Sequence, residues 1–166
     1  MDLRNDRAGN SGDCVGAGTA IALSCDLRYG DETMRYGIPA AKLGIGYNPG
    51  WMRSLVHVVG KANAAEMLMS ARLFDADKAR RTGFANEIHP RAELEDFVDG
   101  LAQTMCGNAP LTLSAAKIAL REIVAPETER DWEAALAAAR LCADSEDYQH
   151  ALAAFAEKRK PAFAGR

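Results

Sequence analysis

The sequence predicts an α/β fold in which a mixed strand-and-helix part is followed by an all-helical part. Three observations lead to this prediction. A turn of small residues at 13–18 runs directly into an apolar segment that lasts until Asp26. Short segments with strand propensity follow that segment. After residue 90, apolar residues recur only at helical spacing, which indicates that the second part consists of helices.

The turn at 13–18 is the most informative stretch of the chain. Gly16 and Gly18 allow close approach of backbone and ligand, and the first amides of a helix have no partner within it. An acyl carbonyl placed at these amides would be stabilised as negative charge develops, by roughly 3 kcal/mol per donor. The apolar segment predicts a fully buried helix. The alternative for this Gly-x-Gly is close packing without any ligand.

Two short strands and a loop are predicted next. Residues 27–29 and 34–36 have strand propensity and are separated by a turn cluster at 30–32. The composition of residues 44–50 is that of a loop.

Helices are predicted on both sides of Gly60. Pro49 can open the first helix, and apolar residues at positions 52, 55, 56 and 59 follow helical spacing. The same spacing recurs after Gly60. Asp75 is predicted to cap a short helix that ends at Gly83.

Four further helices are predicted after residue 90. The first carries apolar residues between positions 94 and 105, and the second begins at Pro110. Thr128 is predicted to cap the third helix, and Asp144 or Ser145 the fourth.

The composition excludes several classes of protein. The chain has 166 residues, of which 48% are apolar, enough to bury the core of one domain. A net charge of -3 argues against a nucleic-acid partner. The longest apolar run falls short of the ~20 residues that span a bilayer, so no membrane association is expected. Residues 1–12 are polar and rich in Gly, Asn and Ser, so we expect disorder there and no signal peptide.

The cysteines lead to a prediction about the cell compartment. Cys14, Cys25, Cys106 and Cys142 are widely separated and lack metal-ligand spacing. They are interpreted as buried thiols of a cytoplasmic protein without a metal site.

Seven short motifs in fixed order resemble the crotonase superfamily, the enoyl-CoA hydratase/isomerase fold. The resemblance covers residues 14–166. It implies a partial ClpP/crotonase-like ββα spiral at 13–90, followed at 91–166 by a helical oligomerisation region that packs into trimers or hexamers. The motifs lie at residues 26–29, 34–39, 42–46, 59–61, 65–68, 79–84 and 154–161.

The resemblance also implies several ββα turns ahead of the Gly-rich turn, which supply one oxyanion amide and most of the coenzyme A pocket. The sequence lacks these turns, and residues 2–12 do not have the pattern of the missing strand. The expectation is therefore either a truncated or mis-started gene product, or a chain that has lost that site.

Hydratases of this family use two glutamates, because one must activate water while the other handles the proton at Cα. The resemblance places Ala20 and Ala40 at these two positions. Alanine cannot transfer a proton, so hydration by the family mechanism is not expected. The Ala17 amide matches the family's second oxyanion donor, and this role needs no particular side chain.

An enolate stabiliser without a general base suits a reaction that forms its carbanion by losing CO2. Residues 43–48 and 144–149 resemble the methylmalonyl-CoA decarboxylase branch, in which a tyrosine close to the substrate carboxylate matches Tyr47. The alternative is a turn tyrosine with its ring on the core and its hydroxyl in water.

Phe155 and Lys158 match a Phe-x-x-Lys pattern that in many hydratases reaches the coenzyme A of a neighbouring subunit. The alternative for Lys158 is that its charge offsets the negative end of the last helix.

Three functions remain open. The first is an acyl-CoA lyase of fatty acid metabolism that stabilises a thioester enolate, with coenzyme A as part of the substrate and no separate cofactor. The second is a non-catalytic crotonase-fold module for oligomerisation or interaction. The third is an inactive truncated remnant.

Overall fold

The computed structural model describes residues 7–166, which form two compact units. The first unit ends at Gly100, and the second runs from Leu101 to Arg166. The boundary falls inside helix α4 (Arg91–Cys106). After residue 90, the described secondary structure consists of helices only.

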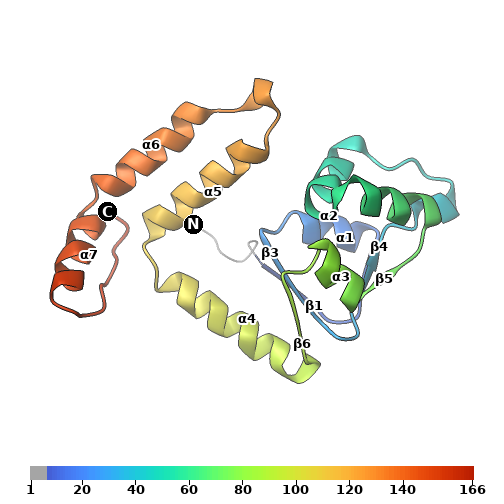
Figure 1. Cartoon of the computed structure of the whole chain (residues 1–166), viewed down its shortest axis with the longest axis horizontal. Coiled ribbons are helices and arrows are strands. Elements are labelled where there is room, and N and C mark those ends of the chain that lie inside the picture. The colour runs from blue at the N-terminus through green and yellow to red at the C-terminus, as the bar shows by residue number, and fades with distance from the viewer. Residues whose placement is uncertain (1–6) are drawn as a thin grey trace. The chain divides into compact units, whose positions relative to one another are not determined.

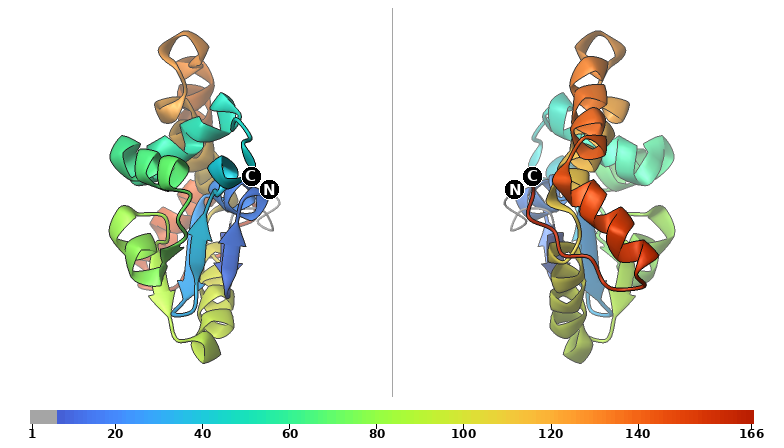
Figure 2. Two further views of the ribbon diagram at one scale, coloured as in Figure 1. Left: turned by 90° about the vertical axis from the view of Figure 1, so that its right-hand side faces the viewer. Right: turned by 90° about the vertical axis from the view of Figure 1, so that its left-hand side faces the viewer.

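The first unit is built on two three-stranded sheets, and the strands from β1 to β4 alternate between them. One sheet is wholly parallel, and in the other β2 pairs parallel with β4 while β5 is antiparallel to β4 (Figure 2). The strands of the first sheet are β1 (Arg7–Asn10), β3 (Leu27–Asp31) and β6 (Glu87–His89); those of the second are β2 (Asp13–Val15), β4 (Arg35–Gly37) and β5 (Phe74–Asp75).

The disorder expected for residues 1–12 is wrong for residues 7–10. These residues form strand β1, whose register along β3 pairs Arg7 with Leu27 and Asn10 with Gly30. The polar sequence concealed the strand because its partner lies about twenty residues further along the chain. Residues 1–6 lie outside the described part of the chain.

Besides the first part of α4, four helical elements lie in the described part of the first unit. The α2 helix is interrupted at Gly60, where φ is 77° and ψ is 157°, so the two helices predicted around this glycine are confirmed. Asp75 caps α3 by accepting a hydrogen bond from the Lys78 amide at 2.8 Å, and Gly83 ends it, both as predicted. The bounds are α1 Ala17–Leu23, 3₁₀ helix η2 Ala40–Leu43, α2 Pro49–Ser70 and α3 Ala76–Thr82.

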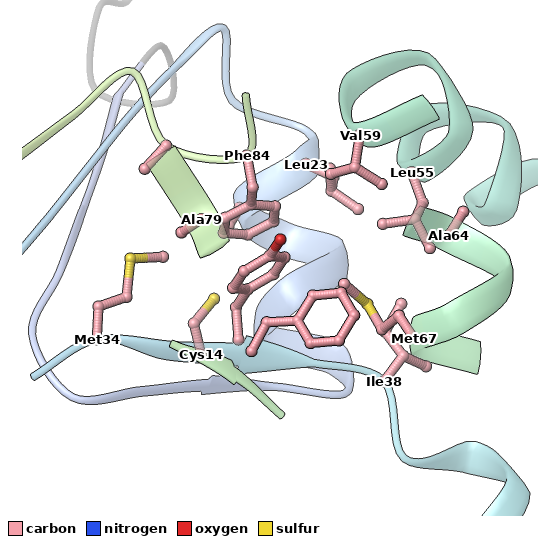
Figure 3. Packing of buried hydrophobic residues seen from close by; sticks show 14 of the residues in the cluster. Cys14, Leu23, Met34, Ile38, Leu55, Val59, Ala64, Met67, Ala79 and Phe84 are labelled. Atoms are coloured by element: carbon pink, nitrogen blue, oxygen red, sulfur yellow. The ribbon is translucent and has the colours of Figure 1, made fainter. Parts of the chain in front are cut away.

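The core of the first unit is a cluster of buried apolar side chains, of which Phe84, Leu55 and Met67 are labelled in Figure 3. Tyr36 belongs to this cluster and is fully buried. The Tyr36 ring stacks on Phe84 with centroids 4.0 Å apart and meets Phe74 edge-on at 5.6 Å. Its hydroxyl shares a 2.7 Å hydrogen bond with the Thr82 hydroxyl, and burial raises the pKa of Tyr36 to about 12. The core therefore joins β4 to α3 and to the segment after it.

In the second unit, α5 and α6 lie side by side (Figure 1). Thr128 does not cap α6; it lies in the 3₁₀ helix η3, and Asp131 caps α6 instead by accepting from the Ala134 amide. Ser145 caps α7, one of the two predicted residues. The bounds are α5 Pro110–Val124, η3 Glu127–Glu129, α6 Trp132–Ala143 and α7 Glu146–Ala156.

The segment after α7 folds back onto the start of that helix. The buried Asp147 carboxylate accepts hydrogen bonds from the Ala164 amide at 2.7 Å and the Gly165 amide at 2.8 Å. The Asp147 amide donates to the Arg166 carbonyl at 3.0 Å. These hydrogen bonds, chiefly the one from Ala164, hold the pKa of Asp147 below its ordinary value.

The four cysteines are free thiols, but they are not all buried as expected. Cys14 is buried and Cys106 is exposed, while Cys25 and Cys142 are intermediate. Within residues 7–166, no helix is long and apolar enough to cross a membrane.

Candidate active site

The Gly-rich turn connects β2 to α1 and is held by backbone geometry that only glycine adopts easily. Gly16 has φ 61° and ψ -116°, and its amide donates to the Gly37 carbonyl of β4 at 2.8 Å. A positive φ is sterically costly for residues with a Cβ. The glycine therefore turns the chain directly from a strand of the second sheet into a helix.

Hydrogen bonds of the Thr19 side chain stabilise this turn. Its side chain is fully buried, and its hydroxyl oxygen lies 2.5 Å from the Cys14 carbonyl oxygen and 3.0 Å from that of Gly37. The same oxygen accepts from the Gly37 amide at 3.3 Å. One hydroxyl thus binds β2 to β4 at the point where α1 begins.

The amide end of α1 is open. Gly16 is the N-cap and provides no side chain, so no side-chain hydrogen bond caps the helix. Ala17, the first helical residue, is exposed. The first-turn amides of Ala17 and Gly18 have no acceptor within the helix, because an α-helix leaves its first four N–H groups unpaired. An oxygen atom placed there would accept from them.

The helix that follows is not fully buried, which corrects the expectation from its apolar sequence. It buries Thr19, Ala22 and Leu23, whereas Ile21 is 68% exposed. The exposed side of α1 is available to form one wall of a cavity.

That cavity has a volume of about 250 Å³ and lies beside the amide end of α1. Ala20, one of the two alanines singled out in the sequence, forms part of its wall. Among the described residues, no side chain with an ionisable group lines it. The residues of its wall are Ala17, Ala20, Ile21, Leu23, Ser24, Trp51 and Ser54. The cavity is therefore predominantly apolar, with two serines on its wall.

Tyr47 lies just before α2, and its hydroxyl is not in water. The ring packs against the core cluster and meets the Trp51 ring edge-on, with centroids 5.6 Å apart and an interplanar angle of 64°. The hydroxyl oxygen is buried and has no hydrogen-bond partner among the described residues. The alternative interpretation is therefore correct for the ring, which lies on the core, and wrong for the hydroxyl, which is not in water. Burial raises the pKa of Tyr47, which keeps the hydroxyl protonated at neutral pH.

The other predicted positions divide between the two units. Ala40 begins η2 and packs against the core of the first unit, half-buried. Phe155 and Lys158 belong to the second unit, where the Phe155 side chain is 86% exposed. Lys158 follows α7 in a left-handed conformation, with φ 55°. No group of three or more His, Cys, Asp or Glu residues within 7–166 is arranged to hold a metal ion.

Several residues of the site were not predicted from the sequence, among them Thr19, Trp51 and Ser54. Thr19 had a signal, because it is a hydroxyl residue inside an otherwise apolar run. Trp51 and Ser54 had none, because they reach the cavity only through the packing of α2 beside α1.

Two three-stranded sheets and a Gly-rich turn into a short helix beside an apolar cavity are the features to compare with known crotonase-type proteins. An enoyl-CoA hydratase/carnithine racemase from Magnetospirillum magneticum has the same fold, with a TM-score of 0.88 and 29% identity; the match covers 96% of this chain and 59% of that one. Residues 8–166 match the family model for enoyl-CoA hydratase/isomerase. The chain belongs to this family, which confirms the resemblance inferred from the motifs.

Curated relatives agree with this assignment. The chain is 35% identical to the 2,3-dehydroadipyl-CoA hydratase of Escherichia coli (strain K12), over 94% of this chain and 61% of the relative. It is 32% identical to a short-chain-enoyl-CoA hydratase of Clostridium acetobutylicum, over 90% of this chain and 58% of the relative. The chain thus spans about three fifths of the length of the curated relatives it matches.

Proposed function

We propose that this chain acts on acyl-CoA thioesters and removes CO2 from a malonyl-type thioester, as in the methylmalonyl-CoA decarboxylase branch. The observation that carries the proposal is the absence of ionisable side chains from the wall of the cavity beside Ala17. Hydration needs an acid and a base there, whereas decarboxylation needs only a place for the developing enolate. Coenzyme A enters as part of the substrate.

The proposed reaction starts from a substrate whose thioester carbonyl oxygen accepts a hydrogen bond from the Ala17 amide. The bond between Cα and the carboxylate carbon breaks, and its electron pair forms the C=C bond of the thioester enolate as CO2 leaves. The enolate carries the negative charge on oxygen, facing the Ala17 amide. Cα then takes a proton from water, so the products are an acyl thioester, CO2 and a hydroxide ion.

Tyr47 and the apolar cavity contribute to different parts of this reaction. The protonated Tyr47 hydroxyl lacks a partner and would donate to the carboxylate, fixing its orientation. Apolar walls solvate a carboxylate poorly and CO2 well, so they favour the loss of charge from the leaving group.

The test is incubation of the 166-residue chain with methylmalonyl-CoA and, separately, with crotonyl-CoA. We expect the chain to release CO2 from methylmalonyl-CoA and not to hydrate crotonyl-CoA. Mass spectrometry of the thioester products measures both reactions.

Tyr47→Phe removes one hydrogen bond to a charged group and is expected to lower kcat roughly tenfold to hundredfold. Tyr148→Phe, which changes a half-exposed tyrosine of the second unit, is the matched control. Hydration of crotonyl-CoA without CO2 release would refute the proposal.

The second candidate function, an oligomerisation module, is favoured by the exposed apolar side chains of the second unit. On α5, α6 and α7 these side chains are about half exposed or more: Leu120, Ile123, Val124, Trp132, Leu136, Leu141, Leu152 and Phe155. Exposed apolar side chains on helices that pack together, as α5 does with α6 and α6 with α7, are typical of association sites. We propose a homotrimer or a hexamer in which Phe155 and Lys158 reach the coenzyme A of a neighbouring copy. Light scattering of the purified chain tests this, because a monomer would contradict it.

A further inference from the structure

Trp51 is both the ring partner of Tyr47 and part of the cavity wall. The two rings meet edge-on at 5.6 Å, and the Trp51 side chain lines the cavity together with Ala17 and Ala20. Edge-to-face pairs of aromatic rings at this distance are attractive and orient one ring with respect to the other. Trp51 therefore connects the tyrosine to the cavity.

The backbone around Trp51 is held in place by the start of α2. Asn48 caps this helix: its side chain accepts from the Gly50 amide at 2.8 Å, and its carbonyl accepts from the Trp51 amide at 3.1 Å. Trp51 thus lies in the first, capped turn of a helix, four residues after Tyr47. The capped turn fixes the origin of the indole side chain, although the ring itself is 57% exposed.

Tyr47 is held by the packing of its ring on the core cluster, not by a capped helix turn or by a hydrogen bond of its hydroxyl to any described residue. The preceding residues from Ala41 to Gly46 are all exposed, and the Tyr47 hydroxyl makes no hydrogen bond to any described residue. A buried hydroxyl without a partner is unfavourable, so without restraint the ring would turn the hydroxyl toward water. The orientation of the hydroxyl consequently depends on the packing of its ring, of which Trp51 provides the aromatic part.

We infer that Trp51 is a positioning residue: through the ring contact it keeps the Tyr47 hydroxyl buried and without a hydrogen-bond partner among the described residues. This inference rests on the proposed function for the role of the hydroxyl in catalysis. The restraint on the ring itself exists without substrate. The two parts can therefore be tested separately.

The first test measures tyrosine titration by ultraviolet absorbance in the chain without substrate. The difference between the unmodified chain and Tyr47→Phe isolates the titration of Tyr47 among the four tyrosines. In Trp51→Leu we expect this titration to move down toward the ordinary pKa of 10.0, because the hydroxyl reaches water. Trp51→Phe, which keeps an aromatic edge, is expected to retain the raised value. Trp132→Leu, at the second tryptophan of the chain, is the matched control and leaves the titration unchanged.

The second test measures kcat and KM on methylmalonyl-CoA. Trp51→Leu is expected to lower kcat roughly tenfold or more, as Tyr47→Phe does, and Trp51→Phe to restore most of it. The double variant Trp51→Leu/Tyr47→Phe is expected to be no slower than Tyr47→Phe alone, because both changes remove the same interaction. Independent, multiplying losses would overturn the inference.

The outcomes separate the two proposals. If the chain releases no CO2 but Tyr47 titrates lower in Trp51→Leu, the proposed reaction fails while the positioning of the hydroxyl stands. If the titration of Tyr47 is the same in folded Trp51→Leu and in the unmodified chain, the inference is overturned, whatever the activity.

Discussion

Gly16 and Gly18 stand two residues apart, yet replacing each with alanine is expected to have opposite effects. At Gly16, where φ is 61° and ψ is -116°, an L-residue is strained by about 1–3 kcal/mol. A Cβ added there meets no atom within 4 Å, so the cost is backbone strain rather than collision. At Gly18, inside α1, a Cβ also meets nothing within 4 Å, and alanine is the better helix former by about 1 kcal/mol.

The difference between Gly16→Ala and Gly18→Ala in free energy of unfolding is therefore expected to be about 2–4 kcal/mol. Urea unfolding measures this difference. The signal is Trp51 fluorescence, recorded in variants that also carry Trp132→Phe, so that it reports the first unit. With slopes of about 1–3 kcal/mol per molar urea, the midpoints should differ by about 1 M or more. Coincident midpoints, or a Gly16→Ala variant at least as stable as Gly18→Ala, would refute the argument that this turn requires glycine.

Two further predictions concern buried polar groups. Thr19→Val keeps the shape of the side chain but removes the hydroxyl that binds Cys14 and Gly37, so it is expected to lower the free energy of unfolding by about 2 kcal/mol. Thr19→Ser keeps a hydroxyl and is expected to lower it less. Equal urea midpoints for Thr19→Val and the unmodified chain would contradict this prediction. Asp147→Asn is expected to loosen residues 164 and 165, measured as faster amide exchange. Because the pKa of Asp147 in the folded chain is lowered, the contribution of its carboxylate to the free energy of unfolding is complete at neutral pH and is lost below its ordinary pKa of 3.8. If Asp147→Asn showed the same loss of stability in acid, the loss would not come from Asp147.

Local signals in the sequence determined several elements correctly. Asp75 caps α3 and Gly83 ends it, and Pro110 begins α5, because capping side chains and glycine or proline dihedral preferences act within one helical turn. The break at Gly60 follows for the same reason. The motifs in fixed order were also sufficient to identify the family.

Tertiary pairing decided the elements that the sequence did not show. Residues 7–10 are polar, but they form β1 because β3 provides a hydrogen-bonding edge. Asp131 caps α6 in place of the predicted Thr128, because residues 127–129 form a 3₁₀ helix ahead of α6. Both results depend on competition between segments that a local pattern does not include.

For the site, the sequence by itself determined the glycine turn, the open Ala17 amide and the alanines at positions 20 and 40, since these follow from residue identity and order. Only the tertiary structure decided that the Tyr47 hydroxyl is buried without a partner and that Trp51 lines the cavity. The physical reason is that burial and ring contacts arise where α1 and α2 pack together, and helical spacing does not specify which faces of two helices meet.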